Sequence, residues 1–192
     1  MTSRAASSDR LSHARKAVAD AGLGALLVTP GPDLRWLTGY EALPLERLTC
    51  LVLPSDGEPF LVAPGLEVPA VQASGVPGLG IEVLGWGETE DPYALIAGRI
   101  GRVGSVGLAN RMWAEQVLRF RAALPDAEQS LASAVLADLR MRKSPDEVDA
   151  LRHAGQAIDR VHSRMAEFLR PGISERAAGR CRRRRRRRHR PP

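Results

Sequence analysis

The sequence contains few of the residue types that mark secreted, metal-binding or membrane-spanning proteins. Its two cysteines, Cys50 and Cys181, are too few for a disulfide framework or a cysteine-based metal site, which fits a reducing compartment. The N-terminal stretch MTSRAASSDR lacks the apolar core of a signal peptide, and no apolar run approaches the roughly 18–20 residues of a membrane span. We therefore expect a cytoplasmic protein with no membrane span. Cys50, inside the apolar run 48–53, is predicted to be a buried small hydrophobic residue.

Aromatic residues and catalytic motifs are also scarce. Aromatics make up 4% of the chain and hydrophobic residues 44%, so the core must be built mainly from Leu, Val, Ile and Ala. The sequence contains no G-x-S-x-G, no C-x-x-C and no phosphate-loop motif, and the glycine-rich segment 75–87 lacks G-x-G-x-x-G order. His153 and His162 share one predicted helix, but nine steps of about 100° place them on opposite faces, so they cannot chelate one metal. We predict no catalytic residue and no metal site in this chain.

The basic character of the chain is concentrated at its C-terminal end. The formal net charge is +6, but segment 181–192 holds eight arginines and no acidic residue. Without these eight, 20 basic residues stand against 22 acidic ones. The high isoelectric point therefore says little about the body of the protein, and does not by itself indicate a nucleic-acid-binding domain.

Strand and helix patterns alternate through the first 142 residues. The predicted strands are 25–29, 48–53, 59–63, 81–86, 103–108 and, at an edge, 127–130. The predicted helices are 9–21, 65–74, 91–100, 114–124 and 131–142. Asp91 is the predicted cap of the third of these helices, with Pro92 at its first position. Asp56-Gly57 predicts a hairpin between the second and third strands, and 32–40 is predicted to be a loop. The expected fold is α/β, a mixed β-sheet flanked by helices on both faces.

One long amphipathic helix follows this domain. Ser144 is its predicted N-cap, Pro145 fits its first position, and Glu147 completes a capping box. Pro171 and Gly172 are expected to close it. An apolar stripe recurs at three- and four-residue steps: Val148, Leu151, Gly155, Ile158, Val161, Met165 and Phe168. So long a stripe needs a large partner surface, which the remaining residues do not supply.

These patterns predict four regions. We expect a disordered N-terminus at 1–8, an α/β domain at 9–140, a linker and the first helix of an incomplete second domain at 141–178, and a disordered arginine-rich tail at 179–192.

Three motifs resemble one known superfamily. The segment RMRKSPDEVDALRHAGQAI at 140–158 resembles the linker and first catalytic-domain helix of the creatinase / aminopeptidase P / prolidase superfamily. PDLRWLTGY at 32–40 resembles an early loop of the same family, and PGISE at 171–175 resembles a later turn. Residues from about 10 to 178 follow the family's order of elements. The resemblance implies the N-terminal part of an Xaa-Pro peptidase, with a creatinase-like N-terminal domain.

The resemblance also implies where the chemistry of such proteins lies. Family members carry a second, "pita-bread" domain with two divalent metals, commonly Mn, Co or Zn, which activate a water for hydrolysis. Their ligands are two aspartates, a histidine and two glutamates, and no position here matches them. We therefore expect this chain to bind no metal and to be inactive alone. The full-length form is expected to be a homodimer that takes peptide substrates only with that second domain. A creatinase-type amidinohydrolase lineage remains an alternative.

Three residues are candidates for a place near substrate, namely Arg35, Trp36 and Tyr40. In the resembling family, residues of a neighbouring subunit's N-terminal domain can wall off the active site. An arginine with two aromatic residues suits a peptide carboxylate or a proline ring. The alternative is that Trp36 and Tyr40 pack their segment onto the domain while Arg35 is solvated.

Seven consecutive arginines, from Arg182 to Arg188, form half of the tail at 179–192. One explanation is an off-frame translation of GC-rich DNA, because arginine codons are common in such readings. The other is a natural extension that binds nucleic acid or an anionic membrane surface through its charge. On that second view, the chain is a non-enzymatic interaction module with a basic tail.

Overall fold

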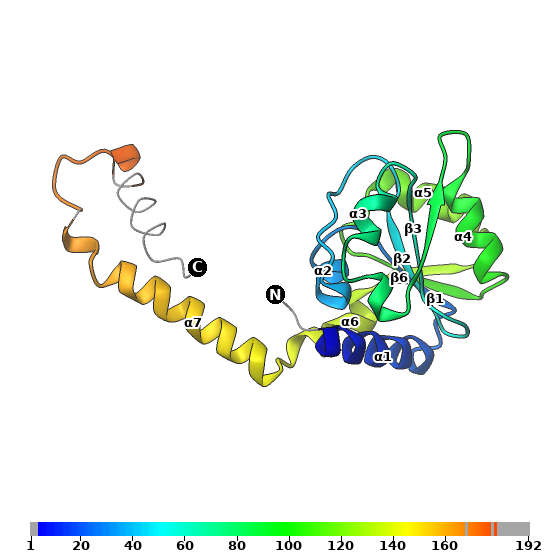
Figure 1. Cartoon of the computed structure of the whole chain (residues 1–192), viewed down its shortest axis with the longest axis horizontal. Helices are drawn as coiled ribbons and strands as arrows, with labels where there is room; N and C mark the ends of the chain where they lie inside the picture. The colour runs from blue at the N-terminus through cyan, green and yellow to red at the C-terminus, as the bar shows by residue number, and fades with distance from the viewer. Residues whose placement is uncertain (1–3, 168, 178, 180–192) are drawn as a thin grey trace. The chain divides into compact units, whose positions relative to one another are not determined.

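The structure is a computed structural model that describes residues 4–167, 169–177 and 179, and it divides the chain into two compact units that meet between Met141 and Arg142. The first unit is an α/β domain (Figure 1). Its strands are β1 (Ala25–Val28), β2 (Cys50–Pro54), β3 (Phe60–Pro64), β4 (Glu82–Trp86), β5 (Ser105–Leu108) and β6 (Glu128–Leu131). Its helices are α1 (Arg4–Asp20), α2 (Pro32–Thr38), α3 (Val68–Gln72), the 3₁₀ turn η1 (Pro77–Leu79), α4 (Pro92–Ile100), α5 (Ala114–Ala123) and α6 (Ser133–Met141). The second unit contains α7 (Pro145–His162) and the 3₁₀ turn η2 (Met165–Glu167).

The six strands form one mixed sheet in the order β4-β3-β2-β1-β5-β6. Strand β2 runs antiparallel to both of its neighbours, and the other pairs are parallel. This confirms the predicted α/β fold with a mixed sheet. The predicted hairpin is the β2–β3 pair, and Gly57 in its turn has a φ of 99°, a conformation that glycine adopts at little cost.

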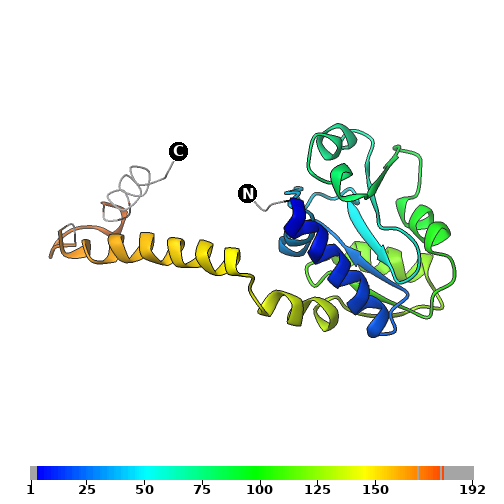
Figure 2. The same cartoon turned by 60° about the horizontal axis from the view of Figure 1, so that its bottom comes forward.

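Helices cover both faces of the sheet (Figure 2). Side chains alternate along each buried strand, so Leu26 and Val28 of β1 belong to one core while Ala25 and Leu27 belong to the other. The first core also contains residues of α1, α2, α3 and α6, and the second contains residues of α4 and α5. Strands buried on both faces read as unbroken apolar runs, as ALLV in β1 does.

Two predicted helix caps and the predicted burial of Cys50 are confirmed by the structure. The Asp91 carboxylate accepts hydrogen bonds from the backbone N–H groups of Tyr93 and Ala94 and caps α4. Ser144 and Glu147 form the predicted capping box at the start of α7. Cys50 is fully buried, and this burial raises the pKa of its thiol.

The N-terminal prediction of disorder at 1–8 is wrong for the residues that the structure describes, because α1 already begins at Arg4. Ser7 is buried and continues the helical stripe of Leu11, Ala14 and Val18 toward the N-terminus. The sequence did not reveal this because serine is usually exposed.

Segment 32–40 is largely a helix and not the predicted loop. Pro32 occupies the first turn of α2, Leu34 and Leu37 are buried on its inner face, and Gly39 ends it with a φ of 75°. Two buried leucines three residues apart are the helical signal, and the charged and aromatic residues between them obscured it.

The long helix is shorter than predicted. α7 ends at His162, and Ser163 bonds back into the last turn, with its N–H on the Asp159 carbonyl and its hydroxyl on the Arg160 carbonyl. Serine side chains compete in this way with regular helix bonding. No residue of α7 is buried, so tertiary packing does not extend it. Phe168 of the predicted stripe and the arginines from Arg182 to Arg188 lie outside the described residues.

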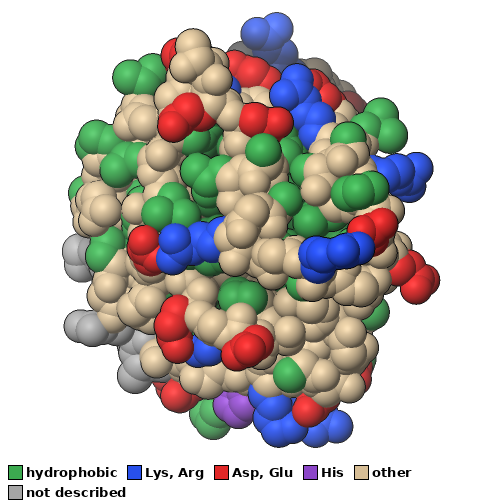
Figure 3. Space-filling view, turned by 90° about the vertical axis from the view of Figure 1, so that its right-hand side faces the viewer, with side chains coloured by type: hydrophobic (Ala, Val, Ile, Leu, Met, Phe, Trp, Pro, Cys, Tyr) green, Lys and Arg blue, Asp and Glu red, His purple; other side chains and the backbone are tan. Residues whose placement is uncertain are grey.

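Basic and acidic side chains lie interspersed on the face drawn in Figure 3. This mixture agrees with the near balance of charges in the sequence before the tail. Within the part of the chain that the structure describes, no helix has the length and apolarity needed to cross a membrane.

Candidate functional site

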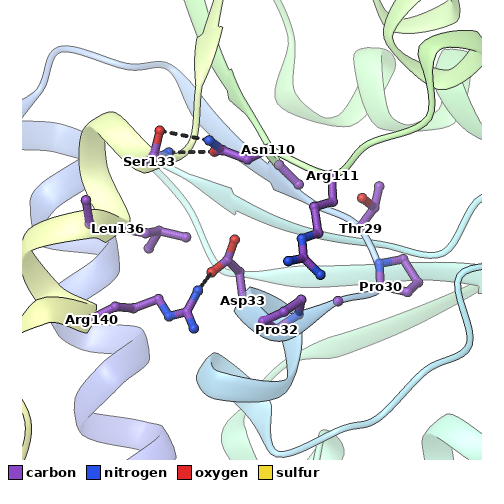
Figure 4. A pocket seen from close by; sticks show the side chains of 12 residues that line it. Thr29, Pro30, Pro32, Asp33, Asn110, Arg111, Ser133, Leu136 and Arg140 are labelled. Carbon is purple, nitrogen blue, oxygen red and sulfur yellow. Dashed lines mark hydrogen bonds and ion pairs between the residues drawn. The ribbon is translucent and has the colours of Figure 1, made fainter.

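A crevice of about 340 Å³ opens at the carboxyl ends of β1 and β5 (Figure 4). Its walls come from the segments that follow these two parallel strands and from α6. After β1 the chain continues toward β2, whereas after β5 it continues toward β6 on the other side. The two connections therefore diverge, and such a switch point is where open α/β sheets commonly hold ligands.

An ion pair crosses one wall of the crevice. Asp33, in the first turn of α2, accepts from Arg140 near the end of α6, with an N–O distance of 2.5 Å. The Asp33 side chain is 21% exposed and the Arg140 side chain 41%. Partial burial makes this pair stronger than a fully solvated one. The pair joins two helices that are more than 100 residues apart in sequence.

A second polar contact fixes the opposite wall. The Asn110 side-chain amide donates to the Ser133 hydroxyl at 3.0 Å, and its carbonyl oxygen accepts from the Ser133 backbone N–H at 2.9 Å. Asn110 therefore ties the segment after β5 to the start of α6. The next residue, Arg111, extends its guanidinium toward Asp33 and Pro32 (Figure 4).

The three residues predicted to lie near substrate do not line this crevice, although two of them share α2 with Asp33. Arg35 is exposed and forms an ion pair with Glu41 at 3.0 Å. Trp36 is half-buried against the first core, beneath the guanidinium of Arg10 at 5.2 Å from its ring centre.

Tyr40 is also half-buried against the first core. Partial burial, with a smaller contribution from Glu67, raises the pKa of its phenol. These positions fit the packing role that was left open for Trp36 and Tyr40, and the role of all three residues near substrate stays a prediction.

The sequence analysis did not single out Asp33, Arg111 or Arg140. The available signal was positional, because Asp33 lies four residues after the predicted strand 25–29, and Asn110 and Arg111 lie two and three residues after the predicted strand 103–108. Those strands had first to be recognised as parallel neighbours, and the sequence did not provide their order. Gly107 assists this pairing, because a Cβ there would lie 2.7 Å from the Leu26 side chain.

Among the described residues, no group of three or more His, Cys, Asp or Glu side chains is placed to hold a metal ion. His153 lies on α7 with its Nδ1 2.8 Å from the Asp149 carbonyl of the preceding turn. His162 is the last residue of the same helix.

Comparisons with known proteins agree with the fold. The model of the creatinase/prolidase N-terminal domain matches residues 10–142. A relative named probable dipeptidase PepE, from Mycobacterium tuberculosis, is 46% identical over 167 residues, which cover 86% of this chain and 44% of the relative.

Solved structures of a dipeptidase and a prolidase are also similar to this chain. The crystal structure of dipeptidase PepE from Mycobacterium ulcerans has a TM-score of 0.91 and 40% identity, covering 96% of this chain and 50% of that one. A prolidase from Thermococcus sibiricus has a TM-score of 0.75 at 28% identity, covering 88% of this chain and 46% of the prolidase. The chain thus spans about half the length of the relatives it matches. With its domain model, its fold and its relatives in agreement, the chain belongs to the creatinase/prolidase N-terminal domain family.

Proposed function

We propose that this chain forms the N-terminal, non-catalytic portion of a metallohydrolase of the Xaa-Pro dipeptidase type. The observation that carries the proposal is the family match over 10–142 together with 46% identity to a probable dipeptidase of about twice this length. On this proposal the hydrolytic chemistry belongs to a second domain. There two divalent metals, Mn, Co or Zn, would activate a water molecule.

The proposal predicts that the 192-residue chain is inactive alone. The test is an assay of the pure chain with Xaa-Pro dipeptides and with creatine, each with and without added Mn²⁺. No turnover is expected with any substrate. Metal-dependent dipeptide hydrolysis would contradict the inactivity, and creatine hydrolysis would favour the alternative amidinohydrolase lineage.

A chimera tests whether the domain serves a dipeptidase. Residues 1–141 of this chain replace the corresponding segment of Mycobacterium tuberculosis PepE, whose matched region is 46% identical. We expect the chimera to fold, to form a homodimer and to retain metal-dependent dipeptide hydrolysis. A folded, metal-loaded chimera without activity would count against the proposal. Light scattering measures the dimer independently of activity.

The same chimera tests the substrate-proximal residues. If Arg35 binds a peptide carboxylate, Arg35→Ala should raise KM by about tenfold, because charge-assisted hydrogen bonds are stronger than neutral ones. Trp36→Phe and Tyr40→Phe keep an aromatic ring packed against the first core. A changed KM in either variant would therefore indicate contact with substrate and not a structural role. Arg121→Ala, on the exposed side of α5, is the matched control. An unchanged KM in all variants would favour the alternative, in which Trp36 and Tyr40 pack onto the domain and Arg35 is solvated.

The arginine run supports a second candidate function. Eight arginines without an acidic residue at 181–192 suit counterion release on nucleic acid or an anionic membrane. The test compares the full chain with a variant ending at Cys181, by salt-dependent binding to duplex DNA and to anionic vesicles. Equal binding by both forms would contradict a function for the tail.

A further inference from the structure

The crevice between β1 and β5 carries an unbalanced positive charge. Three charged side chains line it, and two of these, Asp33 and Arg140, form an ion pair. Within the described residues, the guanidinium of Arg111 makes no ion pair and no hydrogen bond. The lining therefore has a net charge of +1, and its free cation extends into the crevice (Figure 4).

Apolar groups form much of the remaining wall, beside the polar side chains of Thr29, Asn110 and Ser133. Pro30, Pro32, Leu136 and Ala137 all line the crevice. Its volume of about 340 Å³ lies at the lower end of the roughly 300–1,000 Å³ typical of small-molecule sites. A few directed polar groups among apolar walls are characteristic of such sites.

The free arginine is attached to a fixed frame. The neighbouring Asn110 makes both of its side-chain hydrogen bonds to Ser133, and the Asp33–Arg140 pair holds α2 to α6 on the other side. A ligand that binds here does not have to order these walls, which lowers the entropic cost of binding.

We propose that this crevice binds a small aliphatic carboxylate, with the carboxylate on the guanidinium of Arg111 and the apolar body against Pro30, Pro32 and Leu136. Guanidinium is planar and matches a carboxylate with two parallel hydrogen bonds. A single negative charge balances the net +1 of the lining. A phosphate dianion would exceed this charge. The inference does not depend on the proposed dipeptidase function.

The test is a titration of the ¹⁵N-labelled full chain with sodium isobutyrate at constant ionic strength, followed by amide chemical shifts. The amides of Thr29, Asn110 and Ser133 report on the crevice directly, separately from any binding to the arginine tail. We expect saturable shifts with a dissociation constant in the millimolar range. The neutral isobutyramide has the same shape without the charge and is expected to bind at least about tenfold more weakly.

Variants identify the group responsible. Arg111→Ala should weaken isobutyrate binding by about tenfold or more, and Arg111→Lys, which keeps the charge but loses the planar fork, should fall between this variant and the native chain. Arg121→Ala, an exposed arginine on α5, should bind as the native chain does. Because Arg111 is exposed, its replacement should leave the fold intact, which the amide spectrum shows in the same experiment.

Three results would overturn the proposal. One is equal binding of isobutyrate and isobutyramide, which would mean an apolar contact alone. Another is native affinity in Arg111→Ala. The last is tighter binding of inorganic phosphate than of isobutyrate at the same amides, which would assign the crevice to a different class of anion.

Discussion

Gly24 precedes β1 at a point where the backbone approaches Val103 too closely for a side chain. A Cβ on Gly24 would collide with the Cβ of Val103, whose branched side chain has little freedom to move. The N–H of Gly24 also donates to the Ser105 carbonyl at 2.9 Å. Gly24→Ala should therefore lower the free energy of unfolding by about 1–3 kcal/mol, as overpacking does elsewhere. Urea denaturation measures the change.

Gly98 provides the matched control for this prediction. It lies in α4, and a Cβ there would meet no atom within 4 Å. Alanine costs less backbone entropy than glycine in a helix, so Gly98→Ala should raise the free energy of unfolding by roughly 0.5–1 kcal/mol. The two substitutions add the same methyl group but should change the free energy of unfolding in opposite directions. Destabilisation by both, to the same extent, would contradict the assignment of a clash at Gly24.

Tyr93 makes stability dependent on pH in the alkaline range. Its ring is buried edge-to-face against Phe120, with centroids 4.8 Å apart. Burial raises its pKa to about 12, and the nearby Arg119 only partly opposes this shift. Between pH 10 and 12 the unfolded chain loses the phenol proton while the folded chain keeps it, so stability falls as the pH rises.

Tyr93→Phe removes the titrating group and keeps the ring. The native chain should lose more stability than this variant between pH 9.5 and 11.5, and the two should run parallel below about pH 9. Urea denaturation at a series of pH values gives both curves. Curves that stay parallel up to pH 11.5 would show that Tyr93 ionises equally in both states.

At the scale of elements, α4 depends on its N-terminal cap. The backbone N–H groups of Tyr93 and Ala94 have no partner inside the helix. They donate instead to the Asp91 carboxylate, at 2.9 and 3.3 Å. Asp91→Ala should cost about 1 kcal/mol, and Asp91→Ser should recover most of this loss. Asp126→Ala removes an acid from an exposed ion pair with Arg102 and should change the urea midpoint little. Equal effects of Asp91→Ala and Asp126→Ala would contradict the capping role.

Elements with local chemical signals were predictable from the sequence. Asp91-Pro92 marked α4, Ser144 to Glu147 marked α7, and Asp56-Gly57 marked the hairpin, because each signal acts within four residues. The start of α1 was not predictable in the same way. Its first turn is held by burial of Ser7, and that burial depends on the rest of the domain.

The candidate site was harder to predict than the elements that form it. Asp33, Arg111 and Arg140 meet only because β1 lies beside β5 and α6 returns across the same edge. Nothing within a few residues of any of them specifies that order. By contrast, Trp36 and Tyr40 stood out as aromatic residues in a chain that has few, and the structure places both partly in the core.

For the whole molecule, the division into two compact units predicts that the first unit folds independently of the second. Both hydrophobic cores are built from buried residues between Leu11 and Leu136, inside the first unit. A fragment of residues 1–141 should therefore unfold cooperatively, with the same urea midpoint as the full chain. The Asp33–Arg140 pair is retained in this fragment. A clearly lower midpoint would show that the second unit stabilises the first.

The central position of β1 has a consequence for the kinetics of folding. Leu26 pairs with Leu53 of β2, 27 residues away, whereas Ala25 pairs with Val106 of β5, 81 residues away. Closing the longer loop costs more chain entropy, and distant contacts slow folding. The half of the sheet from β1 to β3 is therefore expected to form first, with β5 joining it near the rate-limiting step. The same late event brings the Arg111 segment to the Asp33 segment, so the crevice is completed only as the last barrier is crossed.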